Sequence, residues 1–193
     1  MNMNKILICI ILFSFSEITN GISQGELDLP DSFSEKADRM GIEFYYPIET
    51  RIKRKKNYQD DFLQYDLVLK SKKNFEIRYF LYPNDDPKYT EIHPNIEITR
   101  TIASIATNDE TENIRMNPLS DKEALERFNA DWGVYADFVP KESFSRFKIG
   151  RIVSVYREDR GFLNCIILYK RDNLDRFMGM PMKFVDTIRE EKS

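Results

Sequence analysis

Residues 147–170 read FKIGRIVSVYREDRGFLNCIILYK, with two apolar runs on either side of a turn-forming sequence. The turn sequence is Glu158-Asp159-Arg160-Gly161, so the flanking runs are predicted to pair as a β-hairpin. In the symmetric register, the expected facing pairs are Ile152 with Ile167, Ser154 with Cys165, and Tyr156 with Leu163. Both faces of this hairpin are largely apolar, which predicts a central place in a sheet that carries a layer on each side.

A second hairpin is expected nearer the N-terminus. The runs 62–69 and 75–82 are rich in aromatic and aliphatic residues and are joined by the five residues 70–74. This pattern favours two paired strands with a short loop. One register places Asp66 opposite Arg78, and opposite charges at facing positions stabilise a strand pair modestly.

Three helices are predicted from apolar residues at helical spacing. Their ranges are 94–107, 120–131 and 180–190. Pro94 lies in the first turn of the first helix, where proline is favoured. Ser120 and Glu123 form a capping box at the start of the second helix. The apolar face of the third helix consists of Phe184, Val185 and Ile188.

Two shorter strands complete the prediction. Residues 42–46 are aromatic and β-branched and are followed by Pro47. Residues 135–139 are expected to form an edge strand that ends before Pro140. Strands and helices that come in blocks predict an α+β fold, with a mainly antiparallel β-sheet and helices packed on it.

Residues 1–25 have the layout of a secretory signal peptide. Lys5 is the only cation before the apolar run 6–15, and small residues suit cleavage after Gly21 or Gly25. An apolar run of ten residues is too short to span a bilayer, since a membrane helix needs roughly 20 residues. We therefore expect an exported protein, periplasmic or secreted, without a transmembrane segment.

The mature chain is expected to be a single α+β domain at 26–193 with an irregular or briefly helical arm at 26–40. The whole chain has 29 basic and 32 acidic side chains and a net charge of -3. This near-balance argues against a generally basic nucleic-acid binder and against a strongly acidic disordered chain. The 14 Phe, 10 Tyr and 1 Trp residues supply ample apolar area for a packed core.

The mature sequence offers little recognisable catalytic chemistry. His93 is the only histidine, and Cys165 is the only cysteine outside the leader, which contains Cys9. Gly21-Ile22-Ser23-Gln24-Gly25 matches the nucleophile-elbow pattern of hydrolases, but these small residues are explained by the cleavage site. The chain has no paired Cys or His motif for a metal and no glycine-rich phosphate loop. We expect no catalytic residue, no metal site and no cofactor.

Each remaining reactive residue also has a structural interpretation. Cys165 lies in an apolar run, which favours a buried, inert thiol. His93 precedes a helix-starting proline, which suits a capping or loop-lining role. The pairs Asp60-Asp61 and Asp85-Asp86 are adjacent loop residues, which more often face solvent than act as acid and base.

The strongest local charge feature is a basic cluster of five cations within residues 51–56. Its members are Arg51, Lys53, Arg54, Lys55 and Lys56. Such a cluster suits sulfated glycans, anionic lipid headgroups or nucleic acid, which offer phosphate or sulfate groups. The structural alternative is a solvated loop whose charge is offset by Asp60 and Asp61.

Several features resemble the α/β/α sandwich of the PsbP-like superfamily, which also includes a nuclear-transport GTPase-release factor and small bacterial periplasmic proteins. These features are the early strand 41–47 that ends in proline, the hairpin 150–170, and the C-terminal helix with Phe184 and Ile188. The segment from 128–133 onward is similar to exported bacterial proteins of unknown function. The resemblance implies a binding or assembly role rather than catalysis, and it transfers no binding residue.

The sequence therefore predicts a non-enzymatic, exported binding or accessory protein of a bacterial cell envelope. Its expected partner is a protein or a polyanion of the envelope or extracellular space, without specific nucleic-acid binding. One alternative is a secreted, adhesin-like binder of polyanions through the basic cluster. Another is a hydrolase whose active site assembles only in three dimensions.

Overall fold

The computed structural model describes residues 29–44, 50–52, 65–71, 75–87, 89, 93–109, 114–170 and 182–186. The predicted leader, residues 1–25, lies outside these ranges and stays a prediction. No described helix has both the length and the apolar composition that crossing a bilayer takes.

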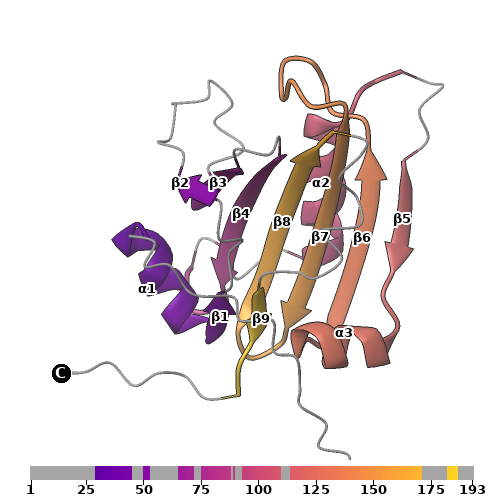
Figure 1. Ribbon diagram of the computed structural model, residues 1–193. Coiled ribbons are helices and arrows are strands. Elements are labelled where there is room, and N and C mark those ends of the chain that lie inside the picture. Colours follow the sequence, from indigo (N-terminus) through magenta and orange to yellow (C-terminus); the bar gives the residue numbers. More distant parts are fainter. Residues whose placement is uncertain are drawn as a thin grey trace, which may run out of the picture.

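A seven-stranded sheet forms the centre of the described structure (Figure 1). Its strands, in spatial order, are β2 (Thr50–Ile52), β3 (Leu67–Ser71), β4 (Phe75–Pro83), β8 (Gly161–Tyr169), β7 (Ile149–Arg157), β6 (Trp132–Phe138) and β5 (Arg115–Pro118). A separate ribbon consists of β1 (Ile42–Phe44) and β9 (Met182–Phe184). All of these strand pairs are antiparallel, which confirms the expected sheet type.

Helices pack on both faces of the sheet. They are α1 (Asp31–Arg39), α2 (Pro94–Ile105) and α3 (Asp121–Phe128). One face is covered by α1, α3 and the β1–β9 ribbon, which place Phe33, Phe128 and Phe184 in a shared core. The other face is covered by α2 through Ile98, Ile102 and Ile105; in Figure 1 this helix lies behind the strands. The α+β class is therefore confirmed.

The hairpin β7–β8 occupies the predicted central position, but its register differs from the prediction. Ile152 faces Ile166, and Ser154 faces Asn164, so the pairing is shifted by one residue. The turn contains three residues, 158–160, because Gly161 already belongs to β8 and pairs with Arg157.

Gly161 explains the shift. It has a φ of 119° and pairs with Pro83 of β4 as well as with Arg157. A Cβ at this position would overlap the Tyr82 carbonyl oxygen. Only glycine permits this backbone conformation together with so close an approach of β4. The residue that was predicted to end the turn therefore begins the strand.

The register of β3 and β4 also differs from the prediction, because Val68 rather than Asp66 faces Arg78. Both charged residues have other partners. Asp66 accepts hydrogen bonds from Lys36 Nζ at 2.8 Å and from the Leu81 amide at 2.7 Å. Arg78 is buried and donates to Glu76 Oε1 at 2.7 Å and to Tyr65 Oη at 2.6 Å.

Two further predictions are wrong. Residues 135–139 do not form an edge strand, since β6 lies between β7 and β5. No sequence pattern indicated β5, whose short Arg-Met-Asn-Pro run is mostly exposed. Within the expected helix 180–190, Met182–Phe184 form a strand instead, with Met182 and Phe184 buried and Lys183 exposed. Residues 180, 181 and 187–190 lie outside the described residues. Three residues with alternate burial satisfy the strand period as well as the helical one.

The locally encoded helices agree with the prediction. Pro94 occupies the first turn of α2, and Ser120 and Glu123 form the capping box of α3. The second helix ends earlier than expected, at Phe128, because Asn129 adopts the left-handed conformation with a φ of 50°. Of the two forms expected for the N-terminal arm, the helical one is present as α1, with Phe33 and Ala37 buried.

The side of α2 that packs on the sheet carries a buried acid, Glu97. Tyr82 Oη donates a hydrogen bond to Glu97 Oε1 at 3.3 Å. Burial raises the pKa of Glu97, and the hydrogen bond from Tyr82 and the nearby Arg100 only partly oppose this effect. The charged carboxylate therefore opposes folding at neutral pH.

We expect Glu97→Gln to stabilise the protein at pH 7, with an advantage that disappears as the pH falls toward about 4. The folded state binds the Glu97 proton more tightly than the unfolded chain does. Acidification therefore protonates Glu97 and removes the free-energy cost of its buried charge in the wild type. Urea unfolding at both pH values measures this difference. An equal shift of the midpoint at both values would contradict the role of the charge.

We expect Gly161→Ala to lower the free energy of unfolding by about 2 to 4 kcal/mol, because strain and overlap with the Tyr82 carbonyl add. The matched control is Gly133→Ala, whose Cβ would meet side-chain atoms and no backbone: chiefly the flexible end of Leu119, with Val155 Cγ1 at 3.3 Å. Urea unfolding should show a clearly smaller loss for the control. Equal losses would argue against the proposed close approach of β4.

Candidate binding groove

A groove of about 610 Å³ lies beside the β1–β9 ribbon. Ile42 and Phe184 of the ribbon line it together with residues of α1 and α3, including Asp38 and Glu126. The groove therefore combines segments from both ends of the described chain. We call it the ribbon groove.

Gly41 allows the chain to turn from α1 into this ribbon. Its φ of +60° lies in the left-handed region, which favours glycine. The Gly41 carbonyl accepts a hydrogen bond of 2.7 Å from the Val185 amide, which extends the pairing of β1 with β9. A Cβ on Gly41 would lie 3.4 Å from both Arg160 Nη1 and the Val185 carbonyl oxygen. The wall of the groove thus depends on the turn at Gly41, where the absence of a side chain lets the backbone approach Arg160 and Val185.

The ionisable side chains that line the ribbon groove are predominantly acidic. The carboxylates are those of Asp38, Glu43, Glu126 and Asp186, and the one cation is Lys183. Lys183 Nζ lies 3.3 Å from Glu43 Oε2, so this pair is mutually neutralised. Glu126 Oε1 lies 3.8 Å from Lys122 Nζ in an exposed pair, which screens it only weakly. The excess of carboxylates over cations in the lining makes the groove attractive to a cation.

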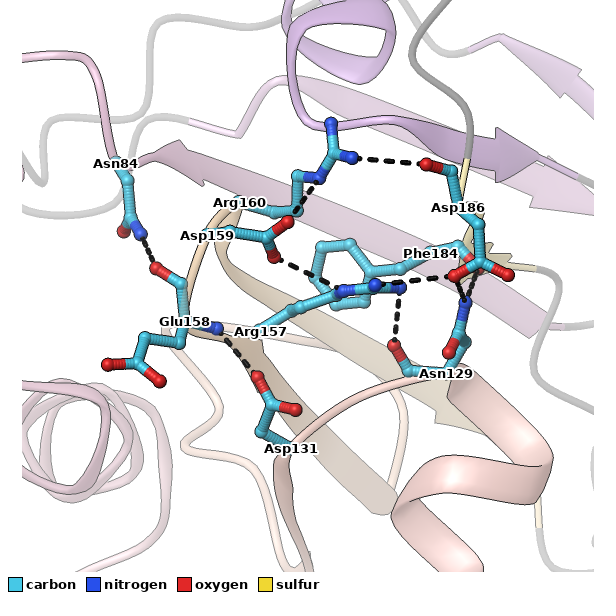
Figure 2. Close-up of polar contacts among 9 residues, drawn as sticks. All are labelled: Asn84, Asn129, Asp131, Arg157, Glu158, Asp159, Arg160, Phe184 and Asp186. Carbon is cyan, nitrogen blue, oxygen red and sulfur yellow. Dashed lines mark hydrogen bonds and ion pairs between the residues drawn. The ribbon is translucent and has the colours of Figure 1, made fainter.

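Asp186 is held by a polar network, which we call the arginine clamp and which consists of Asn129, Arg157, Asp159, Arg160 and Asp186 (Figure 2). Asp186 Oδ1 accepts hydrogen bonds from Asn129 Nδ2 at 3.0 Å and from Arg157 Nη2 at 3.3 Å. These contacts lower the pKa of Asp186, with the Asn129 bond as the main cause. The carboxylate is therefore kept charged at the edge of the groove.

The arginine clamp also joins three elements that are distant in sequence. Arg157 Nη1 donates to the Asn129 carbonyl at 3.3 Å, and Arg160 Nη2 donates to the Asp186 carbonyl at 3.3 Å. Asn129 Nδ2 also donates to the Phe184 carbonyl at 3.2 Å. Hence the β7–β8 turn, the end of α3 and β9 are tied together, which holds the wall of the groove in place.

Asn129 suits its place in the clamp for a backbone reason as well. It follows the last residue of α3 in the left-handed conformation, which asparagine tolerates better than most residues do. Its amide nitrogen is then directed toward β9, as Figure 2 shows. One residue thus ends the helix and orients the acid of the groove.

The basic cluster is described only in part. Arg51 is exposed in β2, where it faces Lys70 of β3. Lys53, Arg54, Lys55 and Lys56 lie outside the described residues, so their role as a polyanion site stays a prediction. Arg51 does not line the ribbon groove.

The reactive residues singled out in the sequence also lie outside the groove. His93 caps α2 through its backbone carbonyl, which accepts from the amides of Ile96 and Glu97, and its side chain makes no capping bond. Cys165 is buried, as expected, and burial raises the pKa of its thiol. Asp85 bonds Arg39 on the surface. Cys9, Ser23 and the Asp60-Asp61 pair lie outside the described residues.

Within the described residues, no group of three or more His, Cys, Asp or Glu side chains is arranged to hold a metal ion. Comparison of the chain with protein-family models, curated proteins and solved structures gave no match. Sequence patterns missed the ribbon groove because β1 and β9 meet only in the folded chain, although Gly41 and Asn129 are local signals for its turns.

We expect Asp186→Asn to destabilise the protein at pH 7 and to destabilise it less at pH 3. The folded pKa of Asp186 is depressed, so its charge contributes stability that is present above the unfolded value of about 3.9 and is lost as the pH falls through the folded value. Urea unfolding at the two pH values tests this. The control, Asp38→Asn, removes a groove carboxylate outside the clamp and should change stability little at either pH.

Proposed function

We propose that this protein is a non-enzymatic, exported binding or accessory protein of a bacterial cell envelope, and that the ribbon groove binds a cationic segment of a partner protein. The observation that carries the proposal is the acidic lining of a preformed groove. A volume of about 610 Å³ falls within the range of roughly 300 to 1,000 Å³ common for ligand sites.

The charges of the groove favour a lysine or arginine side chain as the bound group. Glu43 is neutralised by Lys183, and Asp186 is engaged by Arg157. Asp38 of α1 and Glu126 of α3 are exposed on two different helices that line the groove, and the contact of Glu126 with Lys122 is long, at 3.8 Å, and exposed to solvent. A ligand cation between these helices would gain attraction from both carboxylates without displacing the clamp.

We further propose that the fold is an α/β/α sandwich of the PsbP-like kind. Helices on both faces of an antiparallel sheet, an early strand at β1 and a central β7–β8 hairpin support this kinship. The strand at β9 lies where the resemblance implied a helix, so that feature does not support it. The proposed kinship favours binding or assembly over catalysis.

Polyanion binding through the basic cluster is the second candidate function. It is favoured by the exposed Arg51 on strand β2, which lies at one edge of the sheet beside Lys70. Two cations at facing positions repel each other, and an anion between them would relieve that repulsion. This site and the ribbon groove predict ligands of opposite charge.

A fluorescent Lys- and Arg-rich peptide, with a Glu-rich peptide and heparin as comparisons, distinguishes the two candidates. We expect the mature protein to bind the basic peptide, with an affinity that falls as salt increases. The double variant Asp38→Asn/Glu126→Gln should raise its Kd about tenfold, since each exposed charge contributes roughly 0.5 to 1 kcal/mol.

The control variant is Glu35→Gln/Glu142→Gln, which makes the same change in net charge at exposed positions outside the groove. It should keep nearly the wild-type affinity. Equal weakening by both variants would show that only net charge matters, and the groove would then have no part in binding. Heparin binding that is lost on Arg51→Ser, without binding of the basic peptide, would favour the second candidate.

A further inference from the structure

Two polar side chains face each other in the middle of the sheet without a hydrogen-bond partner. Ser154 of β7 and Asn164 of β8 are directly paired, and neither side chain is exposed to solvent. Among the described residues, Ser154 Oγ, Asn164 Nδ2 and Asn164 Oδ1 have no partner. Facing side chains of an antiparallel pair lie on the same face, with Cβ atoms about 4.5 to 5.5 Å apart.

This pair belongs to the face that α2 covers. The residues beside it on that face are apolar: Phe80 faces Asn164, and Val134 faces Ser154. Both neighbours belong to the core that Ile98 and Ile102 of α2 help to form. The side chains of these paired neighbours therefore offer no donor or acceptor to the three polar atoms, and the nearest strands leave them unsatisfied.

An unpaired polar group in an apolar interior is costly, so native proteins satisfy nearly all of them with protein or ordered water. A buried water typically makes about three hydrogen bonds and needs a polar site with room for it. Here one hydroxyl, one amide nitrogen and one amide oxygen belong to two directly paired residues, which supplies both donors and acceptors.

We propose that Ser154 and Asn164 form an internal hydration site, with at least one long-lived water held between α2 and the centre of the sheet. The water accepts from Asn164 Nδ2 and donates to Asn164 Oδ1 or to Ser154 Oγ. This site is independent of the ribbon groove, which lies on the opposite face with α1 and β9.

Two other hydroxyls in the described residues, those of Tyr79 and Thr101, are buried without a partner, and the Tyr79 hydroxyl provides the contrast. Tyr79 Oη lies on the opposite face, and the Tyr79 ring contacts Phe33 and Phe44. A single hydroxyl among aromatic rings lacks the two to four polar partners that hold a water. The Tyr79 hydroxyl is therefore expected to bind no water, and Tyr79 serves as the control position.

The test is water-selective NMR on the folded, isotopically labelled mature protein. We expect cross peaks between water and the Asn164 side-chain amide and the backbone amides near residues 154 and 164, with the sign of a water that tumbles with the protein. Ser154→Ala should weaken these peaks at least twofold, and Asn164→Leu should abolish them. Tyr79→Phe should leave them unchanged.

The spectrum of the wild-type protein is sufficient to test whether a bound water is present. A folded wild-type protein without such cross peaks, or a high-resolution crystal structure in which Asn164 bonds Ser154 directly with no density between them, would overturn the proposal. If Asn164→Leu does not fold, the milder Ser154→Ala still tests whether the hydroxyl is part of the site, because undiminished peaks in that variant would exclude it.

Discussion

Both faces of the β7–β8 hairpin have to be covered, and the remainder of the described fold follows from that constraint. Every residue of β8 is buried, and alternate side chains point to opposite faces. Cys165 and Ile167 belong to one core, while Ile166 and Leu168 belong to the other. If either face were exposed to water, several large apolar side chains would lose their burial, which would lower the stability of the fold. One layer comes from the nearby α2, but the other requires α1 and β9, from opposite ends of the described chain.

The same requirement accounts for the place of the groove. Because α1, β1 and β9 all serve to cover one face, the ends of the described chain meet there and leave a concave margin against α3. Arg157 and Arg160, at the turn of the central hairpin, reach this layer through Asp186 and its backbone. The residues at the turn of the hairpin thus also hold the wall of the groove in place. The core and the candidate site therefore depend on the same strands.

The helix starts and the central hairpin were predictable because their signals lie within a few neighbouring residues. Pro94 and the Ser120 capping box act within one helical turn, and the apolar runs of the central hairpin show its place directly. Register was not predictable, because it depends on the approach of Gly161 to Tyr82, a contact between strands remote in sequence. Strand β1 was predicted, but its pairing with β9 was not, because the three residues of β9 are too few to distinguish a strand period from a helical one. The groove, which needs that ribbon, was therefore invisible in sequence, while most of the basic cluster lies outside the described residues.

Polar groups are distributed unequally over the two faces of the sheet. This difference decides where substitutions can change ligand preference without unfolding the protein. The α2 face contains the buried Glu76–Arg78 pair at 2.7 Å and the bond from Tyr82 to Glu97. Removing either partner of the Glu76–Arg78 pair leaves an uncompensated buried charge, which is strongly destabilising. The groove is built the other way, with a buried apolar floor and exposed carboxylates at its rim. Substitutions at Asp38 or Glu126 alter the charge that a ligand meets while the core stays intact, so ligand preference can change there without loss of the fold.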